Sequence, residues 1–465
     1  MIDQLKPYPT YKDSGVEWLG QVPAHWEVRR LKNVCLLVYG DALASEVRRD
    51  GNVPVHGSNG RVGFHSVSNT LGPCLVIGRK GSFGKVNFSS EPVFAIDTTY
   101  YVDSRTSSAD IRWLFYLFGW LQLDEVSKDS AIPGLDREDV YQRCVPVPPL
   151  PEQTAIVRFL DWAEGRIQRV IRAGQRRIKL LEEYKQALIH QAVTGQTDVR
   201  TGKRYLAYKD SGVEWLGEVP AHWEVQRLKR TARLNPSKSE VPLAMRNDPA
   251  VFLPMERVGS DGRFDASEVR PISDLWNGFT YFRRGDVIVA KITPCFENGK
   301  GACLQKLPTS VGFGSTEFHV IRPSAAVAPS YLYRVTTLSE FRRLGADEMT
   351  GAAGQQRVPA EFIANFLILL PPLSEQTVIV EYLDAQTAKI DAAMAADRRV
   401  IDLLREYRTR LISDVVTGKV DVREVAERLL EEPPEEESAE QKPMDETEVS
   451  DEGNGEESVE LYVVS

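Results

Sequence analysis

The chain has 465 residues, of which 42% are hydrophobic and 26% are charged, and its net charge is −9. This length is too great for one hydrophobic core and suits two to four domains of an ordinary soluble protein. No apolar run approaches the ~20 residues of a membrane-spanning helix, and no signal peptide is indicated, so we expect no membrane partner. Five scattered cysteines without a CxxC pair favour a reducing, cytoplasmic compartment and argue against a structural zinc.

The negative charge is concentrated at the end of the chain. Residues 424–465 contain 16 acidic residues against Arg428 and Lys442, a net charge of −14, which leaves +5 for residues 1–423. Such a composition buries too little apolar surface to offset chain entropy, so it predicts a disordered acidic tail over 424–465. The tail either keeps the protein soluble or imitates DNA and inhibits the basic body.

The sequence contains an internal repeat, so that one unit occurs twice along the chain. Residues 11–32 (YKDSGVEWLGQVPAHWEVRRLK) return at 208–229 with only two differences, at Gln21/Glu218 and Arg29/Gln226. A second echo pairs PPLPEQT at 148–154 with PPLSEQT at 371–377. The first echo is offset by 197 residues and the second by 223, so the segment between them is 26 residues longer in the second copy. The frame therefore repeats, whereas the inserts differ.

The two inserts, 33–150 and about 230–370, are each predicted to be a mixed α+β domain, because short β-like runs alternate with Gly-rich breaks and one apolar helical stretch. The predicted strands are 74–77, 85–88, 100–102, 286–290 and 317–321, and the predicted helices are 111–123 and 329–344.

Each insert is followed by a long helical pattern. Over 152–193 and 375–415, apolar residues recur every 3.5 to 3.6 positions, which predicts coiled-coil helices. Pro151 fits the first turn of the first helix and Ser374 the N-cap of the second, and Gly195 and Gly418 stand just past the two ends. Gly174 and Asp397 interrupt the apolar seams at matching positions, which predicts a local loosening of both helices.

The two helices are expected to pair with each other. A helix of 42 residues is about 63 Å long, and it does not stay folded with a bare apolar stripe. If the ends of each insert lie close together, the pair is antiparallel, with one insert at each end and a pseudo-twofold relation between the copies. The repeated segment 11–32 would then meet the end of the second helix, where that helix returns to the first insert. The expected order is a head at 1–150, a helix at 151–197, a second head at 198–372, a helix at 373–423 and the tail.

Two different reading heads on a fixed spacer suit duplex DNA, in which sites on one face recur with the helical turn. Beyond this geometry, the sequence resembles the specificity subunit of type I restriction-modification systems. The resemblance rests on the repeated WLGxVPxHWE box (18–27 and 215–224), on the PPLxEQ box before each helix, and on phrases inside the inserts. These phrases are IGRKGSFGKV (77–86), AIDTTYYV (95–102), AKITPCFENGK (290–300), GFGSTEF (312–318) and GAAGQQRVP (351–359).

The resemblance implies that each insert is a target recognition domain that reads one half of a split asymmetric site in double-stranded DNA. The helices would set the spacing and dock two modification (methyltransferase) subunits, and restriction subunits would join them. S-adenosylmethionine, ATP and Mg would bind to those partners, with no cofactor on this chain. The acidic tail is not part of the family pattern.

The candidate DNA-binding residues are polar or basic side chains on Gly-rich loops, where backbone and side chain can approach phosphates and base edges. For each of them, a solvated or turn-stabilising role is the alternative. Gly81, Gly84, Gly299 and Gly314 are expected to shape turns. The candidates are Ser58, Asn59, Arg61, Arg79, Lys80, Ser82, Lys85, Thr98 and Thr99 in the first insert, and Lys291, Thr293, Glu297, Asn298, Lys300, Ser315, Thr316, Gln355, Gln356 and Arg357 in the second.

No motif predicts catalysis by this chain. The NPSK sequence at 235–238 departs from the D/N-P-P-Y/F motif of adenine methyltransferases. The segment 78–85 has five residues between its glycines, where a phosphate loop has four, and Val86 stands in place of the metal-binding Ser or Thr. His25 and His222 are expected to pack or cap. Two other readings stay open, a coiled-coil interaction scaffold and a stand-alone DNA-binding regulator.

Overall fold

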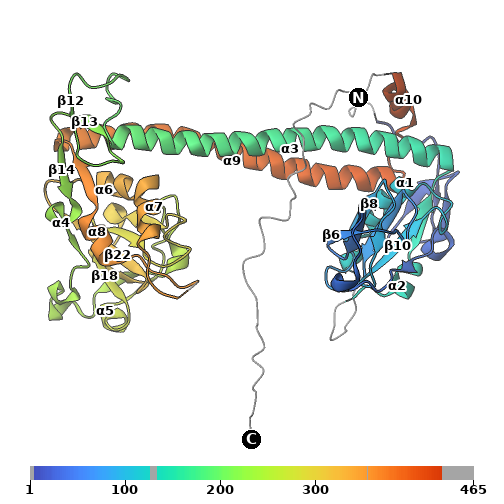
Figure 1. The fold of residues 1–465 in the computed structure, drawn as a ribbon, viewed down its shortest axis with the longest axis horizontal. Coiled ribbons are helices and arrows are strands. Elements are labelled where there is room, and N and C mark those ends of the chain that lie inside the picture. The colour runs from blue at the N-terminus through green and yellow to red at the C-terminus, as the bar shows by residue number, and fades with distance from the viewer. Residues whose placement is uncertain (1–4, 126–133, 353, 432–465) are drawn as a thin grey trace, which may run out of the picture. The chain divides into compact units, whose positions relative to one another are not determined.

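A computed structural model describes residues 5–125, 134–352 and 354–431 (Figure 1). The chain forms two compact units, of which the first combines residues up to 167 with those from 406 onward, and the second holds residues 168–405. Residues 432–465, most of the predicted acidic tail, lie outside the described part. None of the described helices is long and apolar enough to cross a membrane.

The head of the first unit contains two sheets, with strand orders β4-β10-β7-β8 and β6-β5-β9. Strand β7 is the buried centre, because all five of its residues are apolar or small, and helix α1 packs against β7 and β8. The elements are β1 (Tyr11–Asp13), β2 (Gln21–Pro23), β3 (Glu27–Arg30), β4 (Val38–Tyr39), β5 (Val53–Gly57), β6 (Gly60–His65), β7 (Cys74–Gly78), β8 (Val86–Ser89), β9 (Phe94–Ala95), β10 (Thr99–Asp103), α1 (Ile111–Leu121), α2 (Arg137–Tyr141) and β11 (Cys144–Val147).

The head of the second unit repeats this plan, with strand orders β15-β22-β19-β20 and β17-β16-β21-β18. In both heads the second sheet contains one parallel pair, β5 with β9 and β16 with β21. The elements are β12 (Tyr208–Asp210), β13 (Glu218–Pro220), β14 (Glu224–Arg227), α4 (Leu228–Thr231), β15 (Ala232–Leu234), β16 (Pro249–Leu253), β17 (Val269–Pro271), α5 (Ile272–Leu275), β18 (Thr280–Arg283), β19 (Val287–Ala290), β20 (Gly301–Cys303), β21 (Val311–Gly314), β22 (Phe318–Pro323), α6 (Pro329–Thr336), α7 (Ser339–Asp347), α8 (Ala360–Asn365) and β23 (Leu367–Leu370).

Most of the extra length of the second copy lies between equivalent strands. The segment from β5 to β7 covers residues 58–73, whereas its counterpart from β16 to β19 covers 254–286 and adds α5 and β18. The five predicted strands and the helix over 111–123 are confirmed to within about two residues.

Two predictions inside the second head are wrong. The single helix over 329–344 is split into α6 and α7, because Leu338 is buried in an extended conformation (φ −61°, ψ 139°) and acts as the N-cap of α7. Gly314 does not shape a turn but ends strand β21. A Cβ at this position would lie 2.3 Å from the carbonyl oxygen of Leu253, so glycine is needed for close strand packing.

The long helices are α3 (Leu150–Val193) and α9 (Leu373–Val416), and they pack together in both units (Figure 1). In the first unit Arg408 of α9 pairs with Glu164 of α3. In the second unit the Nζ atom of Lys185 lies 2.6 Å from Oδ1 of Asp391. Arg177 of the second unit pairs with Asp397, so within this unit rising numbers in α3 meet falling numbers in α9, which confirms the predicted antiparallel pairing.

The predicted loosening at Gly174 and Asp397 is wrong, because both helices run through these positions without a break. Gly174 lets Ile401 approach closely, since a Cβ there would lie 3.3 Å from the Ile401 side chain. Asp397 is buried and accepts hydrogen bonds from Arg177 across the helix pair. Ser374 is likewise not an N-cap, because α9 already begins at Leu373.

The repeated box 11–32 and its copy bind the end of a long helix. Tyr208 donates a hydrogen bond from its hydroxyl to the Gly195 carbonyl at 2.9 Å, and Tyr11 donates one to the Gly418 carbonyl at 3.1 Å. Gly195 and Gly418 adopt positive φ angles of 72° and 75° and lie so close to a proline and a tryptophan of the box that a Cβ would clash. The contact of Tyr208 with Gly195 joins residues that are close in the sequence. The contact of Tyr11 with Gly418 joins segments near the two ends of the chain, which confirms the prediction that segment 11–32 meets the end of the second long helix.

The PPLxEQ box fastens each head to its long helix. The side chain of Gln153 accepts from the backbone N–H of Asp110 at 2.9 Å and donates to the Pro148 carbonyl at 2.9 Å. Gln376 makes the same two bonds with Ala328 and Pro371, at 2.8 and 2.9 Å. The preceding glutamates accept from the histidines of the repeated box, over 2.8 Å for Glu152 with His25 and 2.9 Å for Glu375 with His222. In the structure both histidines are therefore joint residues.

Helix α10 (Arg423–Glu431) corrects the start of the predicted disordered tail. Val425 and Ala426 are buried on its inner face, and Arg158 of α3 donates to the Ala426 carbonyl at 3.4 Å. Residues 424–431 thus form a helix, because an apolar face within this acidic sequence packs inside the first unit, next to Arg158 of α3.

Candidate nucleic-acid interface

Seven of the nine predicted residues of the first head lie on three loops that the sheet brings together, whereas Arg61 stands in strand β6 and Thr99 in β10. The three loops are the β5–β6 turn at Ser58 and Asn59, the β7–β8 loop at 79–85 and the turn that precedes β10. The Lys85 ammonium group donates to Oδ1 of Asn59 at 2.8 Å. The Ser58 hydroxyl donates to the Thr98 carbonyl at 2.8 Å, and the backbone N–H of Arg79 donates to the same carbonyl.

The nine predicted residues of the first head differ in how exposed they are and in whether other residues already hold them. Asn59, Arg61, Lys80, Ser82 and Lys85 are exposed, and Arg79 and Thr98 are half-buried. The Arg79 guanidinium donates to the Asp97 carbonyl and lies 5.2 Å from the Tyr39 ring centre, so it is already held in place. Ser58 is buried.

Thr99 is a wrong prediction. Its side chain is fully buried, and its hydroxyl donates to the Ile96 carbonyl at 2.7 Å. Its neighbour Thr98 sits in the preceding turn, whereas Thr99 begins strand β10 and points inward. The residue therefore closes the turn from within the core and has no surface to offer a ligand.

A polar groove adjoins these loops and was missed by sequence reasoning. It encloses about 650 Å³ between the β5–β6 hairpin, strand β8 and helix α1. Besides Asn59, Arg61 and Lys85, its lining includes His56, Asn87 and Arg112. A sequence signal existed for Asn87, because it stands two positions after Lys85 and so on the same face of strand β8. No comparable signal marks His56 or Arg112, which long-range packing brings to the groove.

The predicted residues of the second head also converge, on loops 291–300, 315–317 and 350–357. The Thr293 hydroxyl donates to the Gln356 carbonyl at 3.0 Å, and the backbone N–H of Lys291 donates to the Glu317 carbonyl at 2.9 Å. Glu297, Asn298, Thr316, Gln355 and Arg357 are exposed, and Lys291, Thr293, Lys300, Ser315 and Gln356 are half-buried.

Arg357 makes a bidentate ion pair that sequence reasoning did not foresee. Its Nε and Nη2 atoms lie 2.9 and 3.0 Å from the two carboxylate oxygens of Glu317. The bond from Arg357 lowers the pKa of Glu317, with a further contribution from Lys291. A ligand phosphate would have to compete with this carboxylate for Arg357. Lys300 is directed elsewhere, because its ammonium group donates to the Met255 carbonyl at 3.4 Å.

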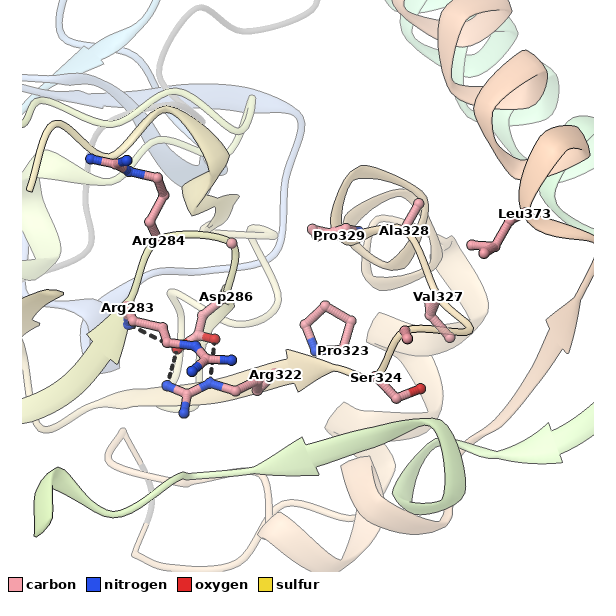
Figure 2. Close-up of a pocket in the computed structure, with 12 residues that line it drawn as sticks. Arg283, Arg284, Asp286, Arg322, Pro323, Ser324, Val327, Ala328, Pro329 and Leu373 are labelled. Atoms are coloured by element: carbon pink, nitrogen blue, oxygen red, sulfur yellow. Dashed lines mark hydrogen bonds and ion pairs between the residues drawn. The ribbon is translucent and has the colours of Figure 1, made fainter. Parts of the chain in front are cut away.

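A second cavity, of about 410 Å³, lies in the second unit between the head and the start of α9 (Figure 2). The charged side chains at its centre are already paired with each other. Arg322 donates from Nε and Nη2 to the two oxygens of Asp286 at 2.7 and 2.8 Å and also pairs with Glu240 (Figure 2 shows the first pair). The remaining lining is mostly proline, alanine and other small or apolar residues, so this cavity is a structural feature of the head.

Among the described residues, no group of three or more His, Cys, Asp or Glu side chains could hold a metal ion. The loops of both heads present amides, hydroxyls and cations at the surface. Such groups hydrogen-bond to phosphate oxygens and to base edges.

The sequence matches the family described as "Type I restriction modification DNA specificity domain" over residues 23–171 and 278–395. Over 167 residues, 35% of this chain, it is 39% identical to the type I restriction enzyme EcoAI specificity subunit of Escherichia coli. That match covers 28% of the EcoAI subunit, so the chain spans less than a third of this relative's length.

Two broader matches follow the whole frame. The type I restriction enzyme MjaVIII specificity subunit of Methanocaldococcus jannaschii is 20% identical over 423 residues, which is 87% of this chain and 95% of that protein. A solved structure from work on "complex assembly and conformational transition of the type I R-M system" covers 86% of this chain and 99% of its own, with a TM-score of 0.62 and 15% identity. At that identity the likeness is one of fold.

Proposed function

Because the chain belongs to the family of type I restriction-modification DNA specificity domains, we propose that it is the sequence-reading subunit of a type I restriction-modification complex. Each head reads one half of a split, asymmetric site in double-stranded DNA. The paired helices α3 and α9 set the distance between the halves and dock two modification subunits, which restriction subunits join. The observation that carries the proposal is one sheet frame used twice with different surface loops, each fastened to a long helix by the same Gln bonds.

The chemistry of the two loop sets supports DNA as the ligand. The exposed cations Arg61, Lys80 and Lys85 suit phosphate oxygens, and amides such as Asn59 and Gln355 suit base edges. Residues 1–423 carry a net charge of +5, which favours a polyanionic partner. We also propose DNA contacts for the other candidate residues that lie at the surface of both heads.

We propose further that this chain supplies recognition and no catalysis. S-adenosylmethionine, ATP and Mg would be bound by the modification and restriction subunits. The assembly would work in the cytoplasm, in keeping with five cysteines that are all free thiols. The purified chain alone should neither methylate nor cleave DNA, and methyl transfer by the isolated polypeptide would contradict this part of the proposal.

The test of the main proposal is replacement of one head. Residues 33–147 are exchanged for the corresponding segment of a relative with a different target, and N6-methyladenine is mapped across the host genome. We expect one half of the methylated motif to change while the other half and the gap stay the same. The matched control exchanges the second head, residues 230–370, and should change only the other half. If either exchange alters both halves together, the two heads do not read separately.

A further inference from the structure

The polar groove of the first head contains hydrogen-bonding atoms that nothing in the fold uses. Nδ1 of His56 and Nδ2 of Asn87 are buried and have no hydrogen-bond partner among the described residues. Both side chains line the groove, together with Asn59, Arg61 and Lys85. Buried donors and acceptors are nearly always paired in native proteins, because leaving them unpaired costs free energy. Atoms left unpaired at the wall of an open groove point to a ligand that pairs with them.

The second head shows that the fold itself does not require polar residues at these positions. The registers of β7 with β10 and of β19 with β22 align Gly78 with Ala290. Following the neighbouring strands from there, the counterpart of Asn87 is Ala302. The parallel pairs in the second sheet make Leu253 the counterpart of His56.

Leu253 and Ala302 are fully buried and belong to one apolar cluster of the second head. The same frame therefore closes this place with an apolar core in one head and lines it with unpaired polar groups in the other. Stability alone favours the apolar solution, since it leaves no buried polar atom without a partner. A role outside folding is needed to account for His56 and Asn87.

The inserted segment of the second head covers the place that corresponds to the open groove of the first head. The backbone N–H of Gly301 donates to the Gly259 carbonyl, and Lys300 donates to Met255, so residues 255–259 lie along strand β20. Gly262 packs against Tyr333 of α6. In the first head the corresponding connection is the short turn at residues 58–59, which leaves strand β8 and the face of α1 uncovered.

We propose that this groove is the base-reading surface of the first head, with Asn87 and His56 as specificity-determining residues and Lys85 and Arg61 as phosphate contacts. The inference rests on the proposed function and deepens it. An asparagine amide carries donors and an acceptor side by side, the pattern that matches a base edge in the major groove. Burial lowers the pKa of His56, and the nearby Arg61 adds to this effect. The imidazole is therefore neutral near pH 7 and offers one donor and one acceptor.

Arg112 has a positioning role in this arrangement. Its guanidinium bonds to Oδ1 of Asp161 at 2.9 Å and lies 4.5 Å from the centre of the Phe88 ring and 5.0 Å from that of Phe115. These contacts hold Arg112 in the lining of the groove. Its charge is paired with Asp161, so the more exposed Lys85 and Arg61 are the cations that reach the phosphates.

The test uses Asn87→Ala and His56→Leu, which introduce the residue types that stand at the equivalent positions of the second head, Ala302 and Leu253. The complex of the full chain with its modification subunits is equilibrated with duplexes randomised across both half-sites, and bound sequences are counted. We expect preference at one or two positions of a single half-site to fall by about 5- to 150-fold per variant, the range of one lost base contact. Preferences in the other half-site should be unchanged.

Three further variants make the result specific. Asn87→Asp, which replaces donors by acceptors, should change the preferred base at the same position. Lys85→Ala should weaken all sequences alike and lower the salt dependence of binding by about one charge. Asn52→Ala, an exposed amide outside the groove lining, is the matched control and should leave both binding and preference at the parental values.

The inference is overturned if Asn87→Ala and His56→Leu keep the parental unfolding midpoint and the parental preference profile. It is also overturned if Asn87→Asp weakens every sequence equally without a change in preferred base. A parental complex that shows no sequence preference in either half would instead contradict the proposed function. The two failures are therefore distinguishable in one experiment.

Discussion

At the scale of single residues, Arg322 carries a charge into the core of the second head. It is 7% exposed, and its partner Asp286 is fully buried and also accepts from the backbone N–H of Arg283 at 2.8 Å. Removal of one member leaves the other charge buried and unpaired. We predict that Arg322→Leu lowers the free energy of unfolding by about 3–5 kcal/mol, measured by urea denaturation.

The double variant Arg322→Leu/Asp286→Leu separates the pair from its surroundings. With both charges removed, we expect part of the lost stability to return, because two apolar side chains leave no unpaired charge. Arg343→Leu is the control, since Arg343 pairs with Asp347 on an exposed helix surface and should cost no more than about 1 kcal/mol. A double variant less stable than Arg322→Leu alone would show that the ion pair is not the source of the loss.

His319 predicts a dependence of stability on pH. Its Nε2–H donates to the Val358 carbonyl at 2.9 Å inside the second head. Burial lowers the pKa of His319, and Lys291 adds to this, against the opposing effects of the Val358 bond and Glu317. The unfolded chain, with a histidine pKa of about 6.5, therefore binds the proton more readily than the native state. Stability from this group is present above that pH and is lost as the pH falls below it.

The measurement compares the parental chain with His319→Gln in urea between pH 7.5 and 5.5. We expect the parental free energy of unfolding to fall more steeply, by at most about 1.4 kcal/mol per pH unit. Glutamine keeps a donor for Val358 but does not titrate, so the difference between the two slopes isolates His319. Parallel curves would mean that this histidine has the same pKa in the native and unfolded states.

At the scale of elements, two glycines of α3 offer a matched test of helix packing. A Cβ at Gly165 would meet nothing within 4 Å, whereas one at Gly174 would lie 3.3 Å from two carbons of the buried Ile401. Alanine is favoured over glycine in a helix interior by about 1 kcal/mol. We predict that Gly165→Ala gains most of this stability and that Gly174→Ala gains less or loses stability, as measured by urea unfolding midpoints. Equal gains would show that the helix pair tolerates an extra methyl group at Gly174.

The elements also differ in how far the sequence determines them in advance. The ends of α3 and α9 and their antiparallel pairing could be predicted because helix period, caps and the repeated boxes are local signals. The break at Leu338 could not, because it depends on the burial of that side chain against the rest of the head. The loops carrying Lys85 and Arg357 could be recognised as candidate sites. Their partners, and the groove at His56 and Asn87, depend on strand pairings between distant segments.

At the scale of the whole molecule, comparison of the two copies shows which contacts stay the same and which connections differ. The joints keep the same histidine–glutamate contact in both copies, His25 with Glu152 at 2.8 Å and His222 with Glu375 at 2.9 Å. The heads keep the strand order and differ in connections such as 58–73 and 254–286. Changes in the connections can therefore alter a surface without disturbing the joints. This division suits a protein whose heads change target while the spacer stays the same.

The last prediction tests the helices as the element that sets the spacing. Four residues are inserted between Lys179 and Leu180 of α3, and four between Ala395 and Ala396 of α9. These positions face each other, since Arg177 pairs with Asp397 and Gly174 contacts Ile401. The insertion adds about 6 Å, close to one turn, to both helices and preserves their apolar seam. At about 3.4 Å per base pair, we expect the gap in the methylated motif to lengthen by one or two base pairs, with the bases in each half unchanged.

The control inserts two residues at each site, which lengthens both helices but shifts the register of their apolar seam. It rotates the following seam by about half a turn and buries polar faces, so it should lower the unfolding midpoint and methylation together. The four-residue variant should keep the parental midpoint, because every contact beyond the insertion keeps its partner. Methylome sequencing of cells that carry each variant gives the gap directly. If the stable four-residue variant methylates the parental motif with its original gap, the spacing is fixed by the partner subunits and not by α3 and α9.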